Sequence, residues 1–284
     1  MCSNITKQKT SPVYRVIALD LDGTLTNNKK EVTPQTRASL MKAQECGCTI
    51  VLASGRPTYG IEPVAECLEI GKHGGYVLSY NGGNIVEWKT KETLYGKSLP
   101  EKCLLPIYQY AKQHGYALLG YKGKNIVTEN PDDEYVKEES RINKMNIVKT
   151  DNLMESIDPR PAKLLLTGHP SLMIKAEQEL AEKLSRQMEV YRSAPFFVEL
   201  VPHGIDKAQS LLRLLERMNL TPADMMAFGD GYNDLSMLRL AGMGVAMSNA
   251  APEVRAEADY VTLSNEADGV AYALSKLCLP DIGL

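Results

Sequence analysis

The sequence predicts an α/β protein with a doubly wound, parallel-sheet core that is interrupted by a separate α+β domain. Short apolar runs alternate with helical patterns near both ends of the chain, which is typical of a parallel sheet covered by helices on both faces. Each of these runs ends in a polar or glycine-rich loop. In the middle of the chain, strands instead come in pairs, which favours an antiparallel sheet. We expect the core at residues 1–84 and 202–284, and the insertion at residues 85–201.

The first core strand is predicted at residues 13–19, a short run rich in β-branched residues that leads directly into Asp20. The next helix begins at Thr33 and Pro34, a residue pair that suits the N-cap and the first helical position. The same alternation continues to a glycine-rich turn at residues 81–83. The remaining helices and strands of this half are expected at residues 34–46, 48–53, 57–70 and 76–80.

The middle of the chain changes character at about residue 84. A hairpin is predicted around Lys122, Gly123 and Lys124, because a short turn sequence separates two apolar runs. Strands are expected at residues 84–88, 94–99, 116–121, 125–128, 162–167, 190–192 and 196–201, and helices at residues 100–114, 132–143 and 171–188.

The alternating pattern of the core resumes near Pro202. An amphipathic helix is predicted at residues 206–218, followed by a buried strand at residues 225–228. An acidic loop at residues 229–234 follows that strand. The last elements are a helix at residues 235–240, a strand at 244–247, a short helix at 252–256 and a strand at 260–262.

Composition indicates a globular protein and excludes several classes. The chain has 284 residues, 44% of them hydrophobic and 24% charged, and its net charge of −3 with no long basic run argues against a nucleic-acid partner. No segment approaches the roughly 18 apolar residues of a membrane span. The polar residues 1–12 lack a signal region. The six scattered cysteines match no metal or redox spacing. We therefore expect a cytoplasmic protein with reduced cysteines and no membrane partner.

Two carboxylates stand at the end of the first predicted strand. In an extended chain, residues two apart point the same way, so Asp20 and Asp22 share one direction. Such a pair repels itself unless a cation, a proton or a basic side chain lies nearby. Solubilising acids before a glycine turn are the ordinary alternative for so short a motif.

Other polar groups are predicted at the same sheet edge, where α/β proteins bind ligands. Taken singly, each has an ordinary role as a helix entry, a surface lysine or an acidic cap. Together they offer carboxylates for a hard cation, a hydroxyl and amides for an anion, and a lysine. These residues are Ser54, Gly55, Arg56, Lys207, Asp230, Asn233 and Asp234.

In these motifs the sequence resembles the haloacid dehalogenase superfamily of phosphohydrolases. The order and spacing agree over nearly the whole chain, from Asp20-Leu-Asp22-Gly-Thr24 to Gly229-Asp230-Gly-Tyr-Asn233-Asp234. The insertion looks like the large C2-type cap of the Cof-like group (type IIB), and the turn at residues 81–83 looks like that group's N-G-[AG] turn. The resemblance implies a Rossmann-like parallel-sheet core with an α+β cap domain.

The resemblance and the chemistry together suggest a phosphatase that uses Mg²⁺ and an aspartyl-phosphate intermediate. Asp20 is expected to be the nucleophile and a metal ligand, together with Asp230. Asp22 is expected to be the general acid and base, and to offer the metal its backbone carbonyl.

Seven further residues are given supporting or phosphate-binding roles. Ser54 and the Gly55 amide would hold the transferring phosphoryl group, while Lys207 would neutralise its charge. Asn233 would reach the phosphate or a metal-bound water. Asp234 would support the site through such a water or by holding Lys207, and Thr24 would also support it. Arg56 would either join the phosphate site or form a structural salt bridge.

The expected partner is a small phosphorylated metabolite, most simply a sugar phosphate, with nucleotide-like and cofactor phosphates left open. Candidate cap contacts to it are Tyr121, Lys122, Lys124 and Arg192. One alternative is a phosphotransferase or phosphomutase, in which a sugar hydroxyl replaces water. Another is a non-catalytic metabolite-binding protein, against which the intact set of catalytic residues argues. The sequence carries no signal for an oligomeric state.

Overall fold

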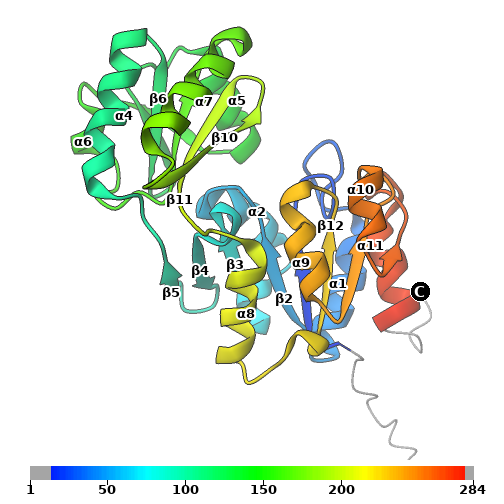
Figure 1. The fold of residues 1–284 in the computed structure, drawn as a ribbon. Coiled ribbons are helices and arrows are strands. Elements are labelled where there is room, and N and C mark those ends of the chain that lie inside the picture. The colour runs from blue at the N-terminus through cyan, green and yellow to red at the C-terminus, as the bar shows by residue number, and fades with distance from the viewer. Residues whose placement is uncertain (1–13, 279–284) are drawn as a thin grey trace, which may run out of the picture.

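The computed structural model describes residues 14–278, which form two sheets with helices packed on them (Figure 1). The predicted lead-in at residues 1–12 and the first residue of the predicted first strand lie outside this range. The larger sheet has eight strands in the order β14-β13-β12-β1-β2-β3-β4-β5, and the smaller has six in the order β10-β11-β9-β6-β7-β8. The prediction of an α/β core with an α+β insertion is therefore confirmed.

Parallel strands form the centre of the larger sheet, with β1 between β12 and β2. The elements of the first half are β1 (Val16–Leu19), α1 (Pro34–Glu45), β2 (Thr49–Ala53), α2 (Thr58–Cys67), α3 (Ile70–His73), β3 (Tyr76–Ser79), the 3₁₀ turn η1 (Tyr80–Gly82), β4 (Asn84–Glu87) and β5 (Glu92–Gly96). Those of the second half are α8 (Lys207–Arg217), η2 (Pro222–Asp224), β12 (Met225–Gly229), η3 (Tyr232–Asp234), α9 (Leu235–Leu240), β13 (Met243–Ala246), α10 (Pro252–Ala256), β14 (Tyr260–Val261), η4 (Asn265–Ala267), α11 (Gly269–Ala273) and η5 (Leu274–Cys278).

Both faces of this sheet are covered, and β1 divides its side chains between them. Ile17 and Leu19 join an apolar cluster with α1, α2 and α11, while Val16 and Ala18 join another with α8, α9 and α10. All four side chains are fully buried. Figure 1 shows α8 and α9 on one face of the sheet and α1 on the other. This double burial explains why the strand is apolar without alternation.

The insertion begins later than predicted. Strands β4 and β5, placed in the insertion by the sequence, instead extend the larger sheet as an antiparallel hairpin on β3. Their apolar residues pack into the core, where Val86 and Trp88 join the cluster on one face and Ile85 joins the cluster on the other. A local hairpin pattern has the same appearance whichever sheet it joins, so the sequence misplaced this boundary.

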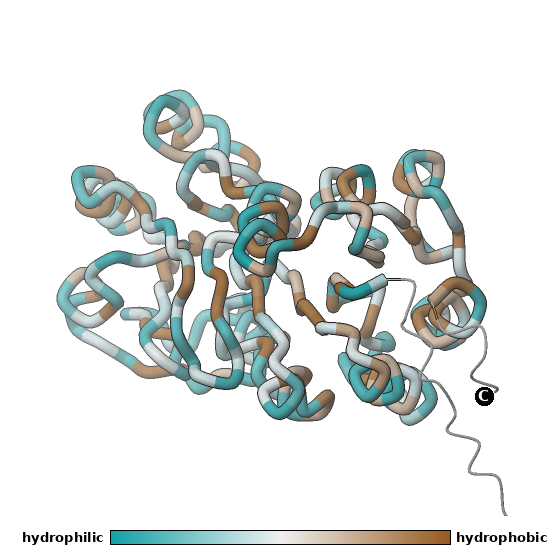
Figure 2. The backbone as a smooth tube through the Cα atoms, turned by 90° about the horizontal axis from the view of Figure 1, so that it is seen from below, coloured by the Kyte–Doolittle hydropathy of each residue, from teal (hydrophilic) through white to brown (hydrophobic). Residues whose placement is uncertain are grey.

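The inserted domain packs helices on both faces of its own sheet. Its elements are α4 (Glu101–His114), β6 (Ala117–Lys122), β7 (Asn125–Thr128), α5 (Glu134–Asn143), β8 (Asn146–Lys149), α6 (Leu153–Ser156), β9 (Leu164–Thr167), α7 (Pro170–Leu184), β10 (Met188–Ala194) and β11 (Phe197–Pro202). Helices α4, α6 and α7 cover one face, and α5 covers part of the other. In Figure 2, hydrophobic residues follow the inner strands, while hydrophilic residues mark outer helix faces and turns.

The two connections between the domains run close together. Lys97, just after β5, donates a hydrogen bond to the backbone carbonyl of His203, just after β11. Tyr80 reaches from the core into the apolar cluster of the insertion, and its ring centroid lies 6.0 Å from that of Tyr121. The insertion is therefore held over the carboxyl edge of the core sheet (Figure 1).

The central strand offers a direct test of the packing. We expect Ile17→Ala to lower the free energy of unfolding by about 2–5 kcal/mol, because it leaves a cavity between the sheet and its helices. Urea unfolding followed by circular dichroism measures this change. Ile174→Ala makes the same chemical change at a side chain that is 46% exposed, and should stay within about 0.5 kcal/mol. Equal effects at the two positions would contradict the described core.

Candidate active site

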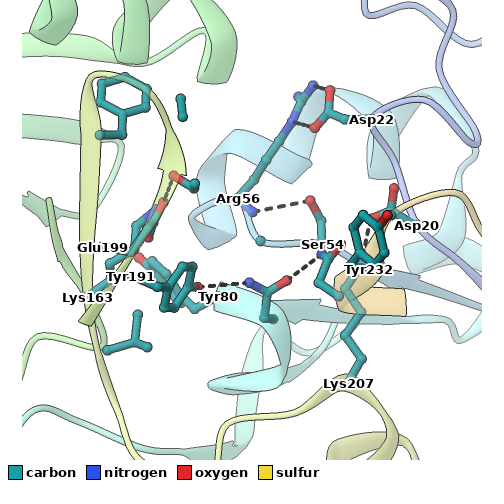
Figure 3. A pocket seen from close by; sticks show the side chains of 18 of the residues that line it. Asp20, Asp22, Ser54, Arg56, Tyr80, Lys163, Tyr191, Glu199, Lys207 and Tyr232 are labelled. Carbon is teal, nitrogen blue, oxygen red and sulfur yellow. Dashed lines mark hydrogen bonds and ion pairs between the residues drawn. The ribbon is translucent and has the colours of Figure 1, made fainter. Parts of the chain in front are cut away.

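The polar loops predicted at strand ends meet at one edge of the larger sheet. Asp20 follows β1, Ser54 follows the neighbouring β2, and Asp230 follows β12 on the other side of β1. Lys207 begins helix α8, whose N-cap Asp206 accepts a hydrogen bond from the backbone N–H of Gln209. Figure 3 shows Asp20, Ser54 and Lys207 together at this edge. Parallel topology therefore gathers residues that are nearly two hundred positions apart.

A buried lysine lies at the centre of the site. The ammonium of Lys207 donates to Oδ1 of Asp20 and to Oδ1 of Asp234, both at 2.6 Å, and its side chain is fully buried. The neighbouring carboxylates stabilise its charge against the cost of burial and hold its pKa above the ordinary value. Lys207 thus ties β1 to the loop after β12.

Asp234 has both carboxylate oxygens occupied. Its Oδ2 accepts hydrogen bonds from the backbone N–H groups of Asp230, at 3.0 Å, and Gly231, at 2.9 Å, while Oδ1 receives Lys207. A carboxylate saturated in this way is better placed to fix the loop and the lysine than to bind a cation. Of the two supporting roles predicted for Asp234, the geometry favours holding Lys207.

One carboxylate oxygen each of Asp20, Asp230 and Asp234 lies within 4.8 Å of the others. Because Asp234 is saturated, Asp20 and Asp230 are the carboxylates of this cluster that could hold a metal ion. The second oxygen of Asp20 accepts no hydrogen bond from the residues that the structure describes. Asp230 is oriented by the Thr24 hydroxyl, 2.7 Å from its Oδ1, and more weakly by Asn249, 3.4 Å from its Oδ2. Carboxylate oxygens are the ligands that Mg²⁺ prefers, so the donor set fits this ion.

The electrostatics of the cluster also favour the binding of a cation. Burial, followed by the charge of Asp234, raises the pKa of Asp20 to about 8, although Lys207 acts in the opposite direction. Burial also raises the pKa of Asp230, although the hydrogen bond from Thr24 acts to lower it. Three carboxylates around one ammonium leave an excess of negative charge that a divalent cation would balance.

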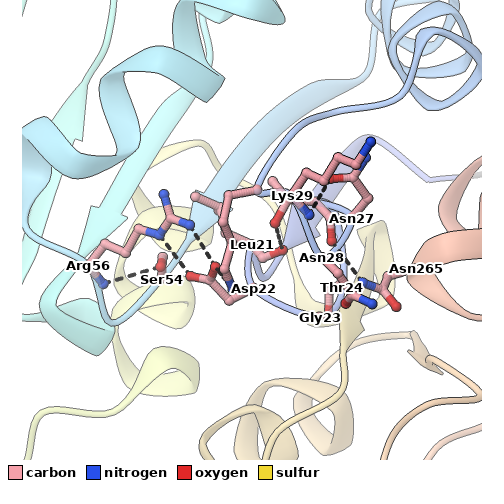
Figure 4. A network of polar contacts seen from close by, with 12 residues as sticks. Leu21, Asp22, Gly23, Thr24, Asn27, Asn28, Lys29, Ser54, Arg56 and Asn265 are labelled. Carbon is pink, nitrogen blue, oxygen red and sulfur yellow. Dashed lines mark hydrogen bonds and ion pairs between the residues drawn. The ribbon is translucent and has the colours of Figure 1, made fainter. Parts of the chain in front are cut away.

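Gly23 allows the turn after β1 to approach the loop after β12. Its φ of +84° favours glycine, and a Cβ atom at this position would lie 2.3 Å from Oδ2 of Asp230. The same turn is fixed by Thr26, whose hydroxyl donates to the Leu21 carbonyl, and by Asn265, whose side-chain amide donates to the Thr26 carbonyl (Figure 4).

Asp22 does not face the same partners as Asp20. Its carboxylate accepts two hydrogen bonds from the Arg56 guanidinium, at 2.6 and 2.7 Å (Figure 4). It also pairs with Lys30 at 2.7 Å. Burial alone would raise the pKa of Asp22, but Arg56 and Lys30 outweigh it and hold that pKa below the ordinary value. Of the two roles predicted for Arg56, the structure therefore shows the salt bridge.

Ser54 and Asn233 line the same cavity as Asp20. The Ser54 hydroxyl accepts a hydrogen bond from the Arg56 backbone N–H at 3.2 Å, which fixes the turn containing Gly55. The Asn233 amide donates to Oδ1 of Asn81 at 3.1 Å, and the Asn81 amide in turn points to the Tyr191 hydroxyl of the insertion, 3.5 Å away. The predicted phosphate-binding residues thus lie beside the two domains' junction.

The four residues predicted to contact the substrate from the cap are less well placed to reach the cavity. Tyr121 is buried inside the insertion and donates a hydrogen bond to Glu139, while Lys124 pairs with Glu62 of α2 at 2.5 Å. Arg192 lines the cavity but pairs with Glu177 at 2.5 Å. Lys122 is exposed and is absent from the cavity wall.

Other residues of the insertion line the cavity instead. Lys163, Tyr191 and Glu199 face the core from strands or their ends (Figure 3). The sequence analysis did not select these residues. Glu199 nevertheless carries a signal of a functional role, because on a strand it shares one face with the apolar residues Phe197 and Val201.

The fold and the site together define a class: an α/β enzyme with an inserted domain, whose aspartates, serine and lysine meet at the carboxyl edge of a parallel sheet. The chain belongs to the haloacid dehalogenase-like hydrolases, because the family model of that description matches residues 17–274. The predicted resemblance to this superfamily is confirmed. Its relatives identify the protein as a phosphoric monoester hydrolase of the superfamily's phosphatase group.

Three comparisons show the extent of the similarity. The protein YxeH of Bacillus subtilis is 32% identical over 270 residues, which cover 94% of this chain and 99% of YxeH. A haloacid dehalogenase-like hydrolase from Bacteroides thetaiotaomicron has a solved structure with a TM-score of 0.91, 49% identity, and coverage of 93% of this chain and 99% of its own. A subclass IIB sugar phosphatase, BT4131, has a TM-score of 0.78 and 25% identity, and coverage of 92% and 98%.

The raised pKa of Asp20 predicts how stability depends on pH without metal. Between its unfolded value of 3.8 and its folded value of about 8, the folded carboxyl binds a proton that the unfolded chain does not. Rising pH in this window therefore removes stability. In EDTA, we expect the wild-type protein to lose stability relative to Asp20→Asn between pH 5 and pH 8, as measured by urea unfolding. The contribution of Asp22, which has the opposite sign, is present in both proteins.

The control is Asp132→Asn, which alters a side chain that is 98% exposed and should follow the wild type at both pH values. Addition of Mg²⁺ at pH 8 should return the lost stability to the wild-type protein. Parallel pH dependence for Asp20→Asn and the wild type would contradict the described burial of Asp20.

Proposed function

We propose that the protein is a Mg²⁺-dependent phosphatase of small phosphorylated metabolites, most simply sugar phosphates, that works through an aspartyl-phosphate on Asp20. The observation that carries this proposal is the bridge of Lys207 between Asp20 and Asp234, beside the carboxylate of Asp230. Similarity to a subclass IIB sugar phosphatase supports the substrate class. None of the described helices is both long and apolar enough to cross a membrane.

Asp20 is the nucleophile in this proposal. One of its oxygens is held by Lys207, and the other is left to attack phosphorus and displace the alcohol. The ammonium of Lys207 also lies where it can offset charge on the phosphoryl group as the bond forms. Ser54, the Gly55 amide and Asn233 lie around the same cavity and would hold the phosphoryl oxygens.

The residues that would hold Mg²⁺ are Asp20, Asp230 and the backbone carbonyl of Asp22. Asp234 and Thr24 support them, since Asp234 fixes the loop and Thr24 orients Asp230. When bound, the ion supplies positive charge that relieves repulsion between the Asp20 carboxylate and the phosphate.

Asp22 would give a proton to the leaving alcohol and then take one from the water that hydrolyses the aspartyl-phosphate. A carboxylate held between Arg56 and Lys30 is ionised and cannot give a proton. The acid step therefore requires the Asp22 side chain to turn away from these cations and acquire a proton. Arg56 would then act as a positioning residue that holds Asp22 in its charged form.

The first test is phosphate release from a panel of metabolite phosphates in the presence of Mg²⁺. We expect turnover in the wild-type protein, its loss in EDTA, and no turnover in Asp20→Asn, which keeps the shape of the side chain but removes its nucleophilic charge. Asp132→Asn is the matched control and should retain wild-type turnover. Retained hydrolysis in Asp20→Asn would disprove the assigned nucleophile.

The same assay distinguishes hydrolysis from phosphoryl transfer to a sugar. An isomerised sugar phosphate that appears without free phosphate would favour a phosphomutase. If no ester of the panel is cleaved under any condition, the function as a non-catalytic metabolite-binding protein would be favoured.

Asp22 is tested separately. We expect Asp22→Asn to lower kcat by about 10²–10⁴-fold for an ester with a poor leaving group, because proton transfer is lost. The loss should be smaller for p-nitrophenyl phosphate, whose leaving group needs little protonation. Steady-state kinetics on both esters measure the difference. An equal loss on the two esters would contradict the role of Asp22 as the acid for the leaving group, because its role as base and any structural role affect both esters alike.

A further inference from the structure

Helix α2 of the core lies against the insertion at its first turn, where it packs on helix α5. The contact is closest at Gly60, where a Cβ atom would lie 2.6 Å from Oδ1 of Asn143. Both residues are buried. Because Cβ atoms in proteins do not come this close to an oxygen, the space between the two helices admits only glycine at position 60.

The backbone of Gly60 does not itself require glycine. The residue lies inside α2, and it is not among the glycines with a left-handed φ. At such a helical position alanine is favoured over glycine, because glycine loses more conformational freedom when the helix forms. The glycine is therefore explained by the contact with Asn143 and not by the helix.

The side chain of Asn143 is fixed in this contact. Its Nδ2 donates a hydrogen bond to the Glu139 carbonyl at 3.0 Å, while its Oδ1, which packs against Gly60, accepts none from the described residues. Rotation would not relieve a clash, since Cβ and Cγ of Asn143 also lie within 3.2 Å of the position that a Cβ would take. A buried oxygen without a donor is unfavourable and calls for an explanation.

Further contacts hold the insertion on the same stretch of the core. Lys124, in the turn between β6 and β7, pairs with Glu62 of α2 at 2.5 Å, and its ammonium lies 5.7 Å from the centre of the Tyr59 ring. Tyr80, directly after β3, packs into the apolar cluster of the insertion. Residues 58–62 of α2 therefore form a seat for the insertion.

Arg56 connects this seat to Asp22. Its Nε and Nη2 donate to the Asp22 carboxylate, and its Nη1 donates to the Gly60 carbonyl at 3.3 Å. Figure 3 shows Arg56 reaching from the Ser54 turn to Asp22. Because the guanidinium is rigid and planar, the bond to Gly60 helps to set the plane in which it holds Asp22. The carbonyl that orients Arg56 thus belongs to the residue against which Asn143 packs.

We propose that Gly60 and Asn143 are positioning residues for Asp22. Their contact sets the first turn of α2, and the Gly60 carbonyl transmits this position through Arg56 to the Asp22 carboxylate. Seating of the insertion therefore aligns the residue that gives a proton to the leaving alcohol, at a contact that does not involve the substrate. This inference rests on the proposed phosphatase function and deepens it.

Gly60→Ala tests the contact, because the added methyl group must push α2 and α5 apart. We expect kcat for an ester with a poor leaving group to fall about 10–10²-fold, since a displacement of about 1 Å remote from the chemistry can have this effect. The loss should be smaller for p-nitrophenyl phosphate, whose leaving group needs little protonation. Unchanged kinetics in Gly60→Ala would overturn the proposal.

Gly71→Ala is the matched control. It makes the same change in helix α3, where the added Cβ would lie 3.2 Å from Trp88 of the core and near no residue of the insertion. Both ester rates should therefore stay within about 2-fold of the wild type. A loss as large as that of Gly60→Ala would show that the effect does not come from the seat.

The double variant Gly60→Ala/Asn143→Ala separates positioning from general damage. Removal of the Asn143 amide leaves its Cβ, at 3.1 Å, as the nearest of the three listed atoms, so most of the rate should return. Hydrogen–deuterium exchange over residues 57–67 and 134–143 should be faster in Gly60→Ala and restored in the double variant. If Gly60→Ala does not fold, the double variant must still fold and be active. A double variant as impaired as Gly60→Ala would overturn the proposal.

Arg56→Lys tests the route to Asp22. Lysine keeps a positive charge beside the carboxylate but lacks the planar fork that also reaches the Gly60 carbonyl. In this background Gly60→Ala should change the ratio of the two ester rates by less than about 2-fold, because residues that act through one another are not additive. A full effect of Gly60→Ala in the Arg56→Lys protein would overturn the route.

The two levels of the hypothesis fail in different ways. If p-nitrophenyl phosphate is cleaved but Gly60→Ala behaves like Gly71→Ala, the positioning role is wrong and the phosphatase function stands. If no ester is cleaved above the Asp20→Asn blank, the proposed function fails and this inference fails with it.

Discussion

The ion bridge made by Lys207 is the interaction on which the arrangement of the site depends. Its ammonium joins Asp20 at the end of β1 to Asp234 after β12, and all three side chains are buried. A buried ammonium without these partners would be strongly destabilising. The bridge therefore fixes how the carboxyl ends of the two strands lie, and with them the spacing of Asp20 from Asp230.

The junction of the two domains applies a second constraint. Tyr80 and Asn81 both have left-handed backbone conformations, with φ of +53° and +55°, directly after β3. Such strain concentrates at functional sites and persists where the surroundings impose it. Here the backbone N–H groups of both residues are held by carbonyls of the Ser54–Arg56 turn, so Asn81 can contact Asn233 on one side and Tyr191 of the insertion on the other. One turn thus links the loops at the strand ends of the core to the insertion.

Much of the core site could be predicted from the sequence, because parallel strands bring their carboxyl ends to one edge regardless of sequence separation. That rule alone groups Asp20, Ser54 and Asp230 at one edge of the sheet. It could not show that Asp22 pairs with Arg56, since side-chain direction after a turn depends on tertiary contacts. The insertion was harder still, because burial of Glu199 follows from which face of its sheet meets the core. Local pattern contains no such information.

The core wall and the insertion wall of the cavity differ in their balance of charge. At the core wall, carboxylates outnumber the buried ammonium, and a divalent cation would balance the excess negative charge. At the insertion wall, Lys163 and Glu199 already neutralise each other, so additional charge there would not be compensated. Under the proposed phosphatase function, this asymmetry would orient the substrate with its phosphate toward Asp20 before any chemistry begins.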